Sequence, residues 1–261
     1  MNFFRIKYLR YLLFSRHRSG HGIHSPFLFD LVSRVFRNKT DHHVVLMIEN
    51  IRKKNISDDR IISVTDLGAG SSRMKSSSRK VSDIVRCSAV PEKYGILLWR
   101  MAKESGHRDI VELGTSAGIS TMYLACGSPD SAVYTIEGCQ ATAEIAGENF
   151  KMAGIKNITL LTGSFDDNLP ELSEKQVRPG LVFIDGNHRK EPTVRYFMQM
   201  ADISDKETVI IIDDIHYSGE MEEAWLAIKK HERVSLTVDI FRMGFVFFRE
   251  GMNRFDYVIR Y

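Results

Sequence analysis

Short apolar runs alternate with stretches of helical periodicity over residues 109 to 249, and this pattern predicts a repeated strand–helix order. The expected strands are 109–113, 132–136, 158–161, 181–184, 209–212, 234–240 and 245–248. The expected helices between them are 119–126, 141–152, 194–200 and 221–230. Continuous apolar strands separated by helices are typical of a parallel sheet that is covered on both faces.

The last two expected strands, 234–240 and 245–248, are joined by a short connection at Gly244. A parallel crossover needs about a dozen residues, so the last strand is expected to run antiparallel. The sequence therefore predicts an α/β fold with a doubly wound, Rossmann-like, seven-stranded sheet and an antiparallel last strand. Residues 1–90 lack this alternation, and we expect them to form a helical N-terminal extension and substrate lid before a domain at 91–261.

Acidic residues recur where the expected strands end. Glu137 ends the second strand, Asp185 follows the fourth, and the pair Asp213 and Asp214 follows the fifth. Ligands of doubly wound sheets bind beyond the carboxyl ends of the strands, near the point where the strand order reverses. We therefore expect these carboxylates to face a ligand.

The first expected strand runs into the glycine turn Gly114-Thr-Ser-Ala-Gly118. A dinucleotide fingerprint needs glycine at the third position of this turn to admit a pyrophosphate, but Ser116 stands there. Glu137 lies 23 residues after Gly114, where an acid can accept both hydroxyls of a ribose. A ribose without a pyrophosphate indicates a nucleoside cofactor, although the turn alone would also fit an ordinary strand-to-helix connection.

Five segments, in this order, resemble the class I methyltransferases, most of all the catechol and caffeoyl-CoA O-methyltransferase branch and related bacterial methyltransferases. They are VELGTSAGIS at 111–120, YTIE at 134–137, ITLLTGS at 158–164, VFID at 182–185 and VIIIDD at 209–214. The resemblance implies S-adenosylmethionine as cofactor and O-methylation of a small-molecule acceptor as the reaction. It leaves open the acceptor and the methylated atom, and RNA or a lipid-like molecule is an alternative acceptor.

The resemblance also implies a set of cofactor-binding residues. They are Glu112, Gly114, Thr115, Ser116, Gly118, Ser120, Glu137, Gly138, Ser164, Phe165 and Asp185. In this set Ser120 would bind the carboxylate of the cofactor, and Glu137 would bind its ribose. Ser164 and Phe165 would border the adenine, and Asp185 would lie beside the sulfonium.

In the resembled branch a divalent cation is held by an aspartate after the fourth strand and an Asp-Asn pair after the fifth. The equivalent residues here are Asp185, Asp213 and Asp214, with Asp214 in place of asparagine. Carboxylates suit a hard cation such as Mg²⁺ or Ca²⁺, which would orient an acceptor hydroxyl. The three acids could equally serve without a metal, so the sequence leaves metal dependence open.

Two histidines join Asp185 as candidate catalytic residues, because imidazole is a suitable general base near neutral pH. His188 stands three residues after Asp185, where the resembled branch has a catalytic lysine. His216 follows Asp214 by two residues and could act as a base or as a metal ligand. Either histidine could instead be an exposed loop residue.

A second glycine cluster, Asp66-Leu-Gly-Ala-Gly70, competes for the role of cofactor turn. The residues after it, 71–80, are rich in serine and basic residues, too polar for the covered helix that such a turn needs. We therefore expect residues 66–80 to form a mobile loop, either a lid or an inert exposed loop.

The first 29 residues contain basic and apolar side chains but no acid. The basic residues are Arg5, Lys7, Arg10, Arg16 and Arg18. We expect a helix here that packs on its own domain or on a second subunit, which makes a homodimer one possible assembly. Contact of residues 1–18 with an anionic membrane surface is the alternative.

Composition narrows the class of protein only a little. The 261 residues are 43% hydrophobic and 26% charged, as in globular proteins with a sizeable core. A net charge of +3 does not by itself favour a nucleic-acid partner, and we expect none to bind stably. Three isolated cysteines and the lack of an apolar run of about 20 residues make the cytoplasm the expected location. A nicotinamide-dependent oxidoreductase and a non-catalytic nucleoside-binding module stay as alternative functions.

Overall fold

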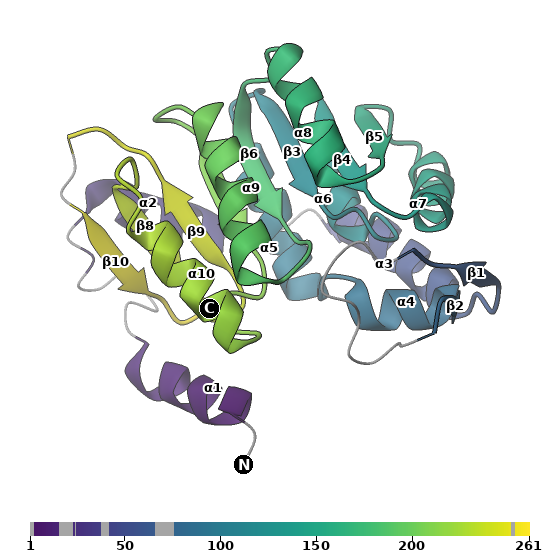
Figure 1. Ribbon diagram of the computed structural model, residues 1–261, viewed down its shortest axis with the longest axis horizontal. Helices are drawn as coiled ribbons and strands as arrows, with labels where there is room; N and C mark the ends of the chain where they lie inside the picture. Colours follow the sequence, from purple (N-terminus) through teal and green to yellow (C-terminus); the bar gives the residue numbers. More distant parts are fainter. Residues whose placement is uncertain (1–2, 16–22, 24, 38–41, 66–75, 252–253) are drawn as a thin grey trace. The chain divides into compact units, whose positions relative to one another are not determined.

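The computed structural model describes residues 3–15, 23, 25–37, 42–65, 76–251 and 254–261 (Figure 1). The chain forms two compact units, of which one is Thr40–Leu181 and the other combines Met1–Lys39 with Val182–Tyr261. The division falls inside strand β6 (Pro179–Ile184). The expected division near residue 90, with a lid before it, stays a prediction.

The main sheet has eight hydrogen-bonded strands in the order β10-β8-β9-β7-β6-β3-β4-β5, which confirms the predicted α/β fold. The strand that the sequence did not predict is β10 (Phe255–Val258), which pairs in parallel with β8 (Leu236–Asp239). Only Tyr257 of β10 is buried. This short edge strand therefore lacks the continuous apolar run that marks the other strands.

Strand β9 (Gly244–Phe247) runs antiparallel to both of its neighbours, β8 and β7 (Val209–Ile212). This confirms the predicted reversal. Gly244 pairs with Ile212 on one side and with Asp239 on the other. The hairpin 240–243 therefore lies beside the carboxyl ends of both β7 and β8.

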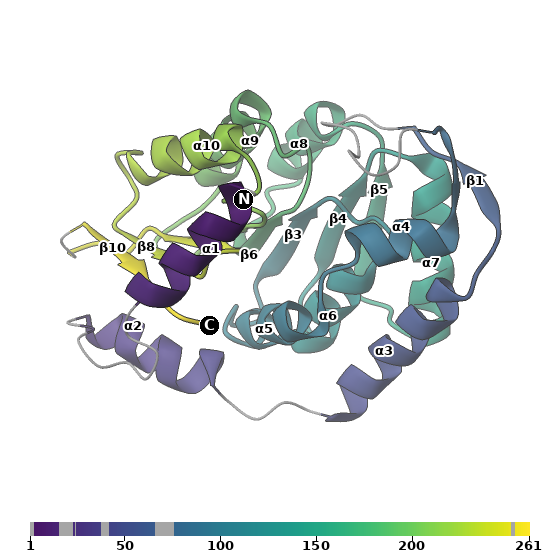
Figure 2. The same ribbon diagram turned by 90° about the horizontal axis from the view of Figure 1, so that it is seen from below.

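The unit Thr40–Leu181 contains three parallel strands of the main sheet, its helices and a small two-stranded sheet. The strands are β3 (Asp109–Leu113), β4 (Val133–Glu137) and β5 (Ile158–Thr162). The helices are α3 (His42–Ile56), α4 (Val81–Ser88), α5 (Glu92–Lys103), α6 (Ile119–Gly127), α7 (Gln140–Ala153) and α8 (Phe165–Glu174). Helices α5 and α6 lie side by side (Figure 2). A Cβ on Gly95 would lie 2.4 Å from the Tyr123 ring, so this close approach needs glycine.

The small sheet of this unit pairs β1 (Ile61–Ser63) antiparallel with β2 (Ser78–Lys80). The sequence predicted a loop over 66–80, but its last three residues form strand β2. The second glycine cluster at 66–70 lies outside the described residues, so its role as lid or inert loop stays a prediction.

The other unit contains β7, β8, β9 and β10, with two helices from the second half of the chain and three N-terminal helical segments. The helices are α9 (Lys190–Asp202), α10 (Gly219–Lys229), α1 (Phe3–Phe14), α2 (Pro26–Leu31) and the π-helix η1 (Val32–Phe36). Helix α1 packs on its own unit, because the buried Tyr11 donates its hydroxyl hydrogen to the Ile259 carbonyl at 2.7 Å. Among the described residues, no helix combines the length and apolar character needed to cross a bilayer.

Candidate functional site

The turn after β3 has a backbone that requires glycine at two positions. Gly114 has φ 106° and Gly118 has φ 76°, and side chains rarely tolerate these angles. A Cβ on Gly118 would also lie 2.4 Å from the Phe150 ring. The Asn149 side chain donates a hydrogen bond to the Ala117 carbonyl at 2.9 Å and is itself buried. Helix α7 therefore packs against the turn and stabilises its conformation.

Glu137, at the end of β4, is tied to this turn. Its Oε2 accepts from the Ser116 N–H at 2.7 Å, and its Oε1 accepts from the Cys139 N–H at 3.0 Å. Ser116 has the unusual φ of 49°, and its hydroxyl lies 2.7 Å from that of Ser88 at the end of α4. A carboxylate oxygen can accept more than one hydrogen bond. The half-buried Glu137 can therefore still accept from ribose hydroxyls.

Glu112 is a fully buried carboxylate on β3, just before the turn. Its Oε2 accepts hydrogen bonds from the hydroxyls of Thr121, at 2.5 Å, and Thr135, at 2.6 Å. Burial raises the pKa of Glu112 to about 7, while hydrogen bonds from Ser120, Thr121 and Thr135 oppose the rise. Its Oε1 is buried and has no hydrogen-bond partner within the described part of the chain. A buried oxygen without a partner is a place where a ligand donor would be stabilised.

Two further residues expected at the cofactor, Thr115 and Ser164, make hydrogen-bonding contacts within the protein. The buried Thr115 hydroxyl lies 2.6 Å from the Thr135 hydroxyl, so it supports the same network. Ser164 caps α8, because its hydroxyl accepts from the Asp167 N–H at 3.1 Å. Phe165 is half-buried, as is Gly138. Their expected places around the cofactor stay predictions.

A strained segment that carries Asp185 and His188 follows β6 in the other unit. Asn187 has φ 67° and His188 has φ 32°, and such angles in non-glycine residues cluster at functional sites. The His188 Nε2 lies 3.6 Å from the Asp185 Oδ1, and the side chain of His188 is 29% exposed. The imidazole ring also lies 6.0 Å from the Tyr217 ring, centre to centre. His188 is therefore reachable from solvent and held near a carboxylate.

Asp213, at the end of β7, is fully buried and bound by Arg242. The Arg242 Nε lies 3.0 Å from Oδ1 and 3.1 Å from Oδ2, and its Nη2 lies 2.6 Å from Oδ2. Burial raises the pKa of Asp213, Asp214 adds to the rise, and Arg242 opposes it. Asp214 is partly exposed, has φ 53°, and lies 3.9 Å from the Arg242 Nε.

The three aspartates expected as metal ligands have partners within the protein. Both oxygens of Asp213 accept from Arg242, and Asp185 lies beside His188. No group of three or more His, Cys, Asp or Glu side chains is placed to hold a metal ion within the described residues. A guanidinium and a divalent cation would compete for the same Asp213 oxygens. The predicted ligand set Asp185, Asp213 and Asp214 stays a prediction, and the structure adds Arg242 as a partner of Asp213 and Asp214.

His216 has carboxylates at both ring nitrogens, which does not favour its expected role as base or metal ligand. Its Nε2 lies 2.7 Å from the Asp239 Oδ2, and its Nδ1 lies 3.1 Å from the Glu222 Oε1. Burial alone would lower the pKa of His216, but the two acids outweigh it and raise the pKa. Glu222 also pairs with Lys7 of α1. His216 is therefore part of an ion-pair network that includes the N-terminal helix.

Sequence reasoning missed Arg242, which lies in the hairpin between β8 and β9. It is the only charged residue of the apolar hairpin Ile240-Phe-Arg-Met243. Because β9 is antiparallel, that hairpin lies at the strand end that carries Asp213. A single arginine in an apolar hairpin was the signal that the sequence offered. Its partner could not be identified without the register of β9 against β7.

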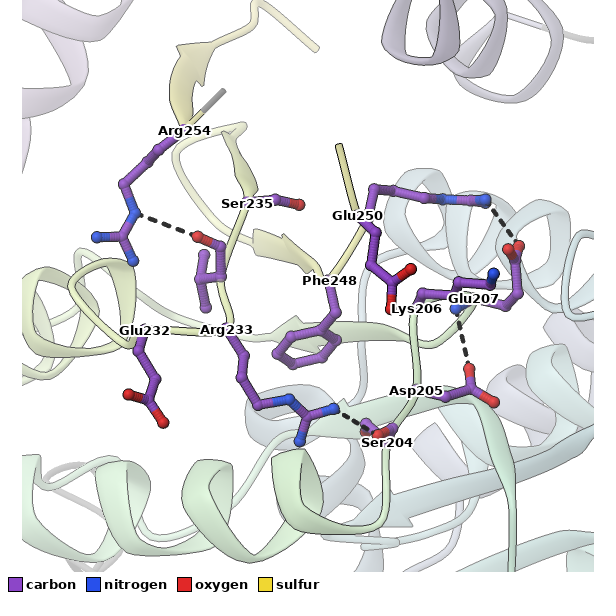
Figure 3. A pocket seen from close by; sticks show the side chains of 12 residues that line it. Ser204, Asp205, Lys206, Glu207, Glu232, Arg233, Ser235, Phe248, Glu250 and Arg254 are labelled. Atoms are coloured by element: carbon purple, nitrogen blue, oxygen red, sulfur yellow. Dashed lines mark hydrogen bonds and ion pairs between the residues drawn. The ribbon is translucent and has the colours of Figure 1, made fainter. Parts of the chain in front are cut away.

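A cavity of about 800 Å³ lies at the amino ends of β7 and β8, opposite to the ends that carry Asp213 and Asp239. Its walls are the segments before β7 and β8 and the segment after β9 (Figure 3). Two arginines of its wall have partners within the protein, since Arg249 pairs with Glu207 at 2.7 Å and Arg233 donates to the Ser204 carbonyl at 2.6 Å. None of the residues expected in the candidate site lines this cavity.

Residues 111–215 match the family model described as a methyltransferase domain. This part of the chain is therefore similar to methyltransferase domains. The chain is similar to a catechol O-methyltransferase of Niastella koreensis, at 31% identity over 136 residues, which make up 51% of this chain and 61% of that protein. The chain spans between 49% and 61% of the length of three curated O-methyltransferases that it matches.

Two solved structures share the fold of this chain. An O-methyltransferase from Bacillus cereus in complex with S-adenosylhomocysteine has 23% identity and a TM-score of 0.56, over 84% of this chain and 96% of that one. An O-methyltransferase from Streptomyces achromogenes in complex with S-adenosylmethionine has 24% identity and a TM-score of 0.55, over 62% of this chain and 82% of that one. The class I methyltransferase resemblance seen in the sequence is confirmed.

Proposed function

We propose that this protein transfers the methyl group of S-adenosylmethionine to an oxygen of a small hydroxylated molecule. The observation that carries the proposal is the turn at Gly114–Gly118, with the buried Glu112 before it and Glu137 hydrogen-bonded to its backbone. The similarity to a catechol O-methyltransferase supports an oxygen as the accepting atom.

The residues of the turn fit the chemical groups of the cofactor. Glu137 would accept the ribose hydroxyls, and Ser120 would bind the carboxylate. S-adenosylmethionine carries an ammonium group, and the open Oε1 of Glu112 would accept a hydrogen bond from this cationic group. When bound, the cofactor supplies an electrophilic methyl group to the reaction. Ser164 and Phe165 would border the adenine, as the sequence predicts.

His188 is the residue best suited to remove a proton from the acceptor. Its imidazole is partly exposed and lies 3.6 Å from the Asp185 carboxylate. A histidine that takes up a proton becomes cationic, and the nearby carboxylate stabilises that state. We therefore propose that Asp185 orients His188 and that His188 deprotonates the acceptor hydroxyl.

The test measures methyl transfer from labelled S-adenosylmethionine to a panel of catechols and other phenols, with the methylated atom identified by mass spectrometry and NMR. We expect an O-methylated product, and His188→Ala should lower turnover by roughly 10²–10⁴-fold while keeping the cofactor Kd. The matched control His107→Ala removes an exposed histidine, whose side chain is 75% exposed, and should leave turnover unchanged. Methylation only on nitrogen or carbon, or equal turnover in His188→Ala, would contradict the proposal.

The partners of the protein stay predictions beyond the small-molecule acceptor. Helix α1 exposes Leu9, Leu13 and Phe14, of which Leu13 is 70% and Phe14 is 69% exposed. These apolar side chains, with the exposed Arg10 among them, leave membrane contact by residues 1–18 and a homodimer as the two expectations to be tested.

A further inference from the structure

Asp213 and Arg242 form a close ion pair at the end of β7. Asp213 has no exposed surface, and the Arg242 side chain is 25% exposed. Three nitrogen–oxygen distances between them lie between 2.6 and 3.1 Å. Such a forked contact uses both carboxylate oxygens and fixes the direction of the carboxylate.

Arg242 also lies near Asp214, the residue after Asp213. Its Nε lies 3.9 Å from the Asp214 Oδ1. The guanidinium is therefore a positive charge shared by two of the three carboxylates that a divalent cation would need.

A divalent cation would have to displace this guanidinium. Mg²⁺ requires oxygen ligands in near-octahedral geometry and gives up its water reluctantly. Arginine stays protonated at all physiological pH values and remains attached to the chain. The backbone also holds Arg242 in place, because its carbonyl accepts from the Ile215 N–H at 3.2 Å.

We propose that Arg242 is a built-in cation that takes the place of a divalent metal ion at Asp213 and Asp214, so that this protein transfers methyl groups without such a metal. The claim that methyl transfer needs no divalent metal rests on the proposed function, whereas the claim about cation binding does not. Arg242 acts here as a positioning residue, because it fixes the direction of the Asp213 carboxylate and neutralises its charge.

The experiment titrates Mg²⁺, Ca²⁺ and Mn²⁺ into the wild-type protein and into Arg242→Ala, with calorimetry and thermal unfolding as readouts. The wild type should show no stoichiometric cation binding, and its turnover should be the same in excess chelator and in millimolar Mg²⁺. In Arg242→Ala the unpaired aspartates should repel, which lowers the Tm. Divalent cation should then bind at one site per chain and raise the Tm by mass action.

The matched control is Arg249→Ala, which removes an arginine of similar exposure that pairs with Glu207 at the other edge of the strands. This variant should gain no cation binding. A second variant, Arg242→Ala combined with Asp213→Asn, removes the buried charge as well. It should fold without added cation and bind none, which keeps the test usable if Arg242→Ala alone does not fold.

The turnover of Arg242→Ala distinguishes an arginine that replaces a metal ion from one that only stabilises the structure. If divalent cation restores both the Tm and the turnover of Arg242→Ala, the arginine stands in for a metal. If cation restores only the Tm, Arg242 is a structural partner of Asp213 and the proposal fails. Stoichiometric cation binding by the wild type, or loss of its turnover in chelator, would also overturn the proposal. A wild type without turnover under any condition would count against the proposed function, whereas the calorimetric result would still decide the cation site.

Discussion

Replacing Glu112 by glutamine should make the cofactor-free protein more stable and its cofactor binding weaker. The wild-type carboxylate is fully buried, and burial raises its pKa from 4.5 to about 7. The folded state therefore holds a proton on Glu112 in the pH range where the unfolded chain has lost it. Glutamine has nearly the shape of the protonated acid but cannot ionise.

The sign and size of the stability effect follow from this pKa. Because the folded pKa lies above the unfolded one, the contribution of Glu112 to stability is fully present below about pH 4.5 and is lost as the pH rises through about 7. Each pH unit between the two pKa values corresponds to about 1.4 kcal/mol, so the loss is roughly 3 kcal/mol. The glutamine amide would lack a partner at the Oε1 position, which reduces the gain by about 1 kcal/mol. We therefore expect Glu112→Gln to be about 2 kcal/mol more stable than wild type at pH 8, and no more stable than wild type below pH 4.5.

The assay combines urea unfolding across this pH range with calorimetric titration of S-adenosylmethionine. A cationic group beside Oε1 favours the carboxylate, so binding near pH 7 should release a proton and the affinity should rise with pH. Loss of this charged contact should weaken binding by roughly 1.5–3 kcal/mol. The control Glu144→Gln changes an exposed glutamate of α7 and should alter neither readout. A Glu112→Gln variant that is destabilised at pH 8 but binds the cofactor normally would refute the reasoning.

Three further outcomes are expected. Gly118→Ala should lower the free energy of unfolding by roughly 1–3 kcal/mol, because of its positive φ and the 2.4 Å approach to a ring; the matched Gly147→Ala, with open space around it, should stabilise helix α7 by up to about 1 kcal/mol in chemical denaturation. His216→Ala should destabilise the protein most below pH 6.5, the ordinary pKa of histidine. Because the pKa of His216 is raised in the folded state, the stabilisation by this side chain is lost as the pH rises through the folded-state pKa. A difference in Tm from wild type that grows toward high pH would contradict this. If α1 contacts membranes, wild type should float with anionic vesicles but not with neutral ones, and Leu13→Ser with Phe14→Ser should abolish flotation; equal flotation of the variant would count against this contact.

The sequence was sufficient for the parts of the fold that depend on local pattern. Apolar runs such as 209–212 predict their strands, and the short connection at Gly244 predicts the reversed β9. Strand β10 could not be predicted in this way, because only one of its side chains is buried and its pairing with β8 depends on tertiary structure. The same pattern argument identifies Gly114 and Gly118, whose backbone angles require glycine.

The electrostatics of the site could not be predicted from local pattern. Asp213 and Arg242 are 29 residues apart, and His216 and Asp239 are 23 residues apart, so both pairs depend on how the hairpin 240–243 folds back. This folding turns an expected metal ligand into one half of an ion pair. It also turns an expected base into a histidine with two carboxylate partners. The raised pKa of Glu112 likewise arises from burial by the surrounding core.

Calorimetric titration of S-adenosylmethionine into wild type and Glu137→Gln tests whether the cofactor binds at the turn Gly114–Gly118. Glu137 is the acid at the end of β4 that is hydrogen-bonded to the turn, and glutamine keeps one acceptor oxygen for the Ser116 N–H. We expect one cofactor site per chain in the wild type and binding weakened by roughly 1.5–3 kcal/mol in the variant, with similar unfolding temperatures for the two proteins. Absence of binding by the folded wild type, or equal affinity in Glu137→Gln, would contradict a methyltransferase whose cofactor site is built on this turn.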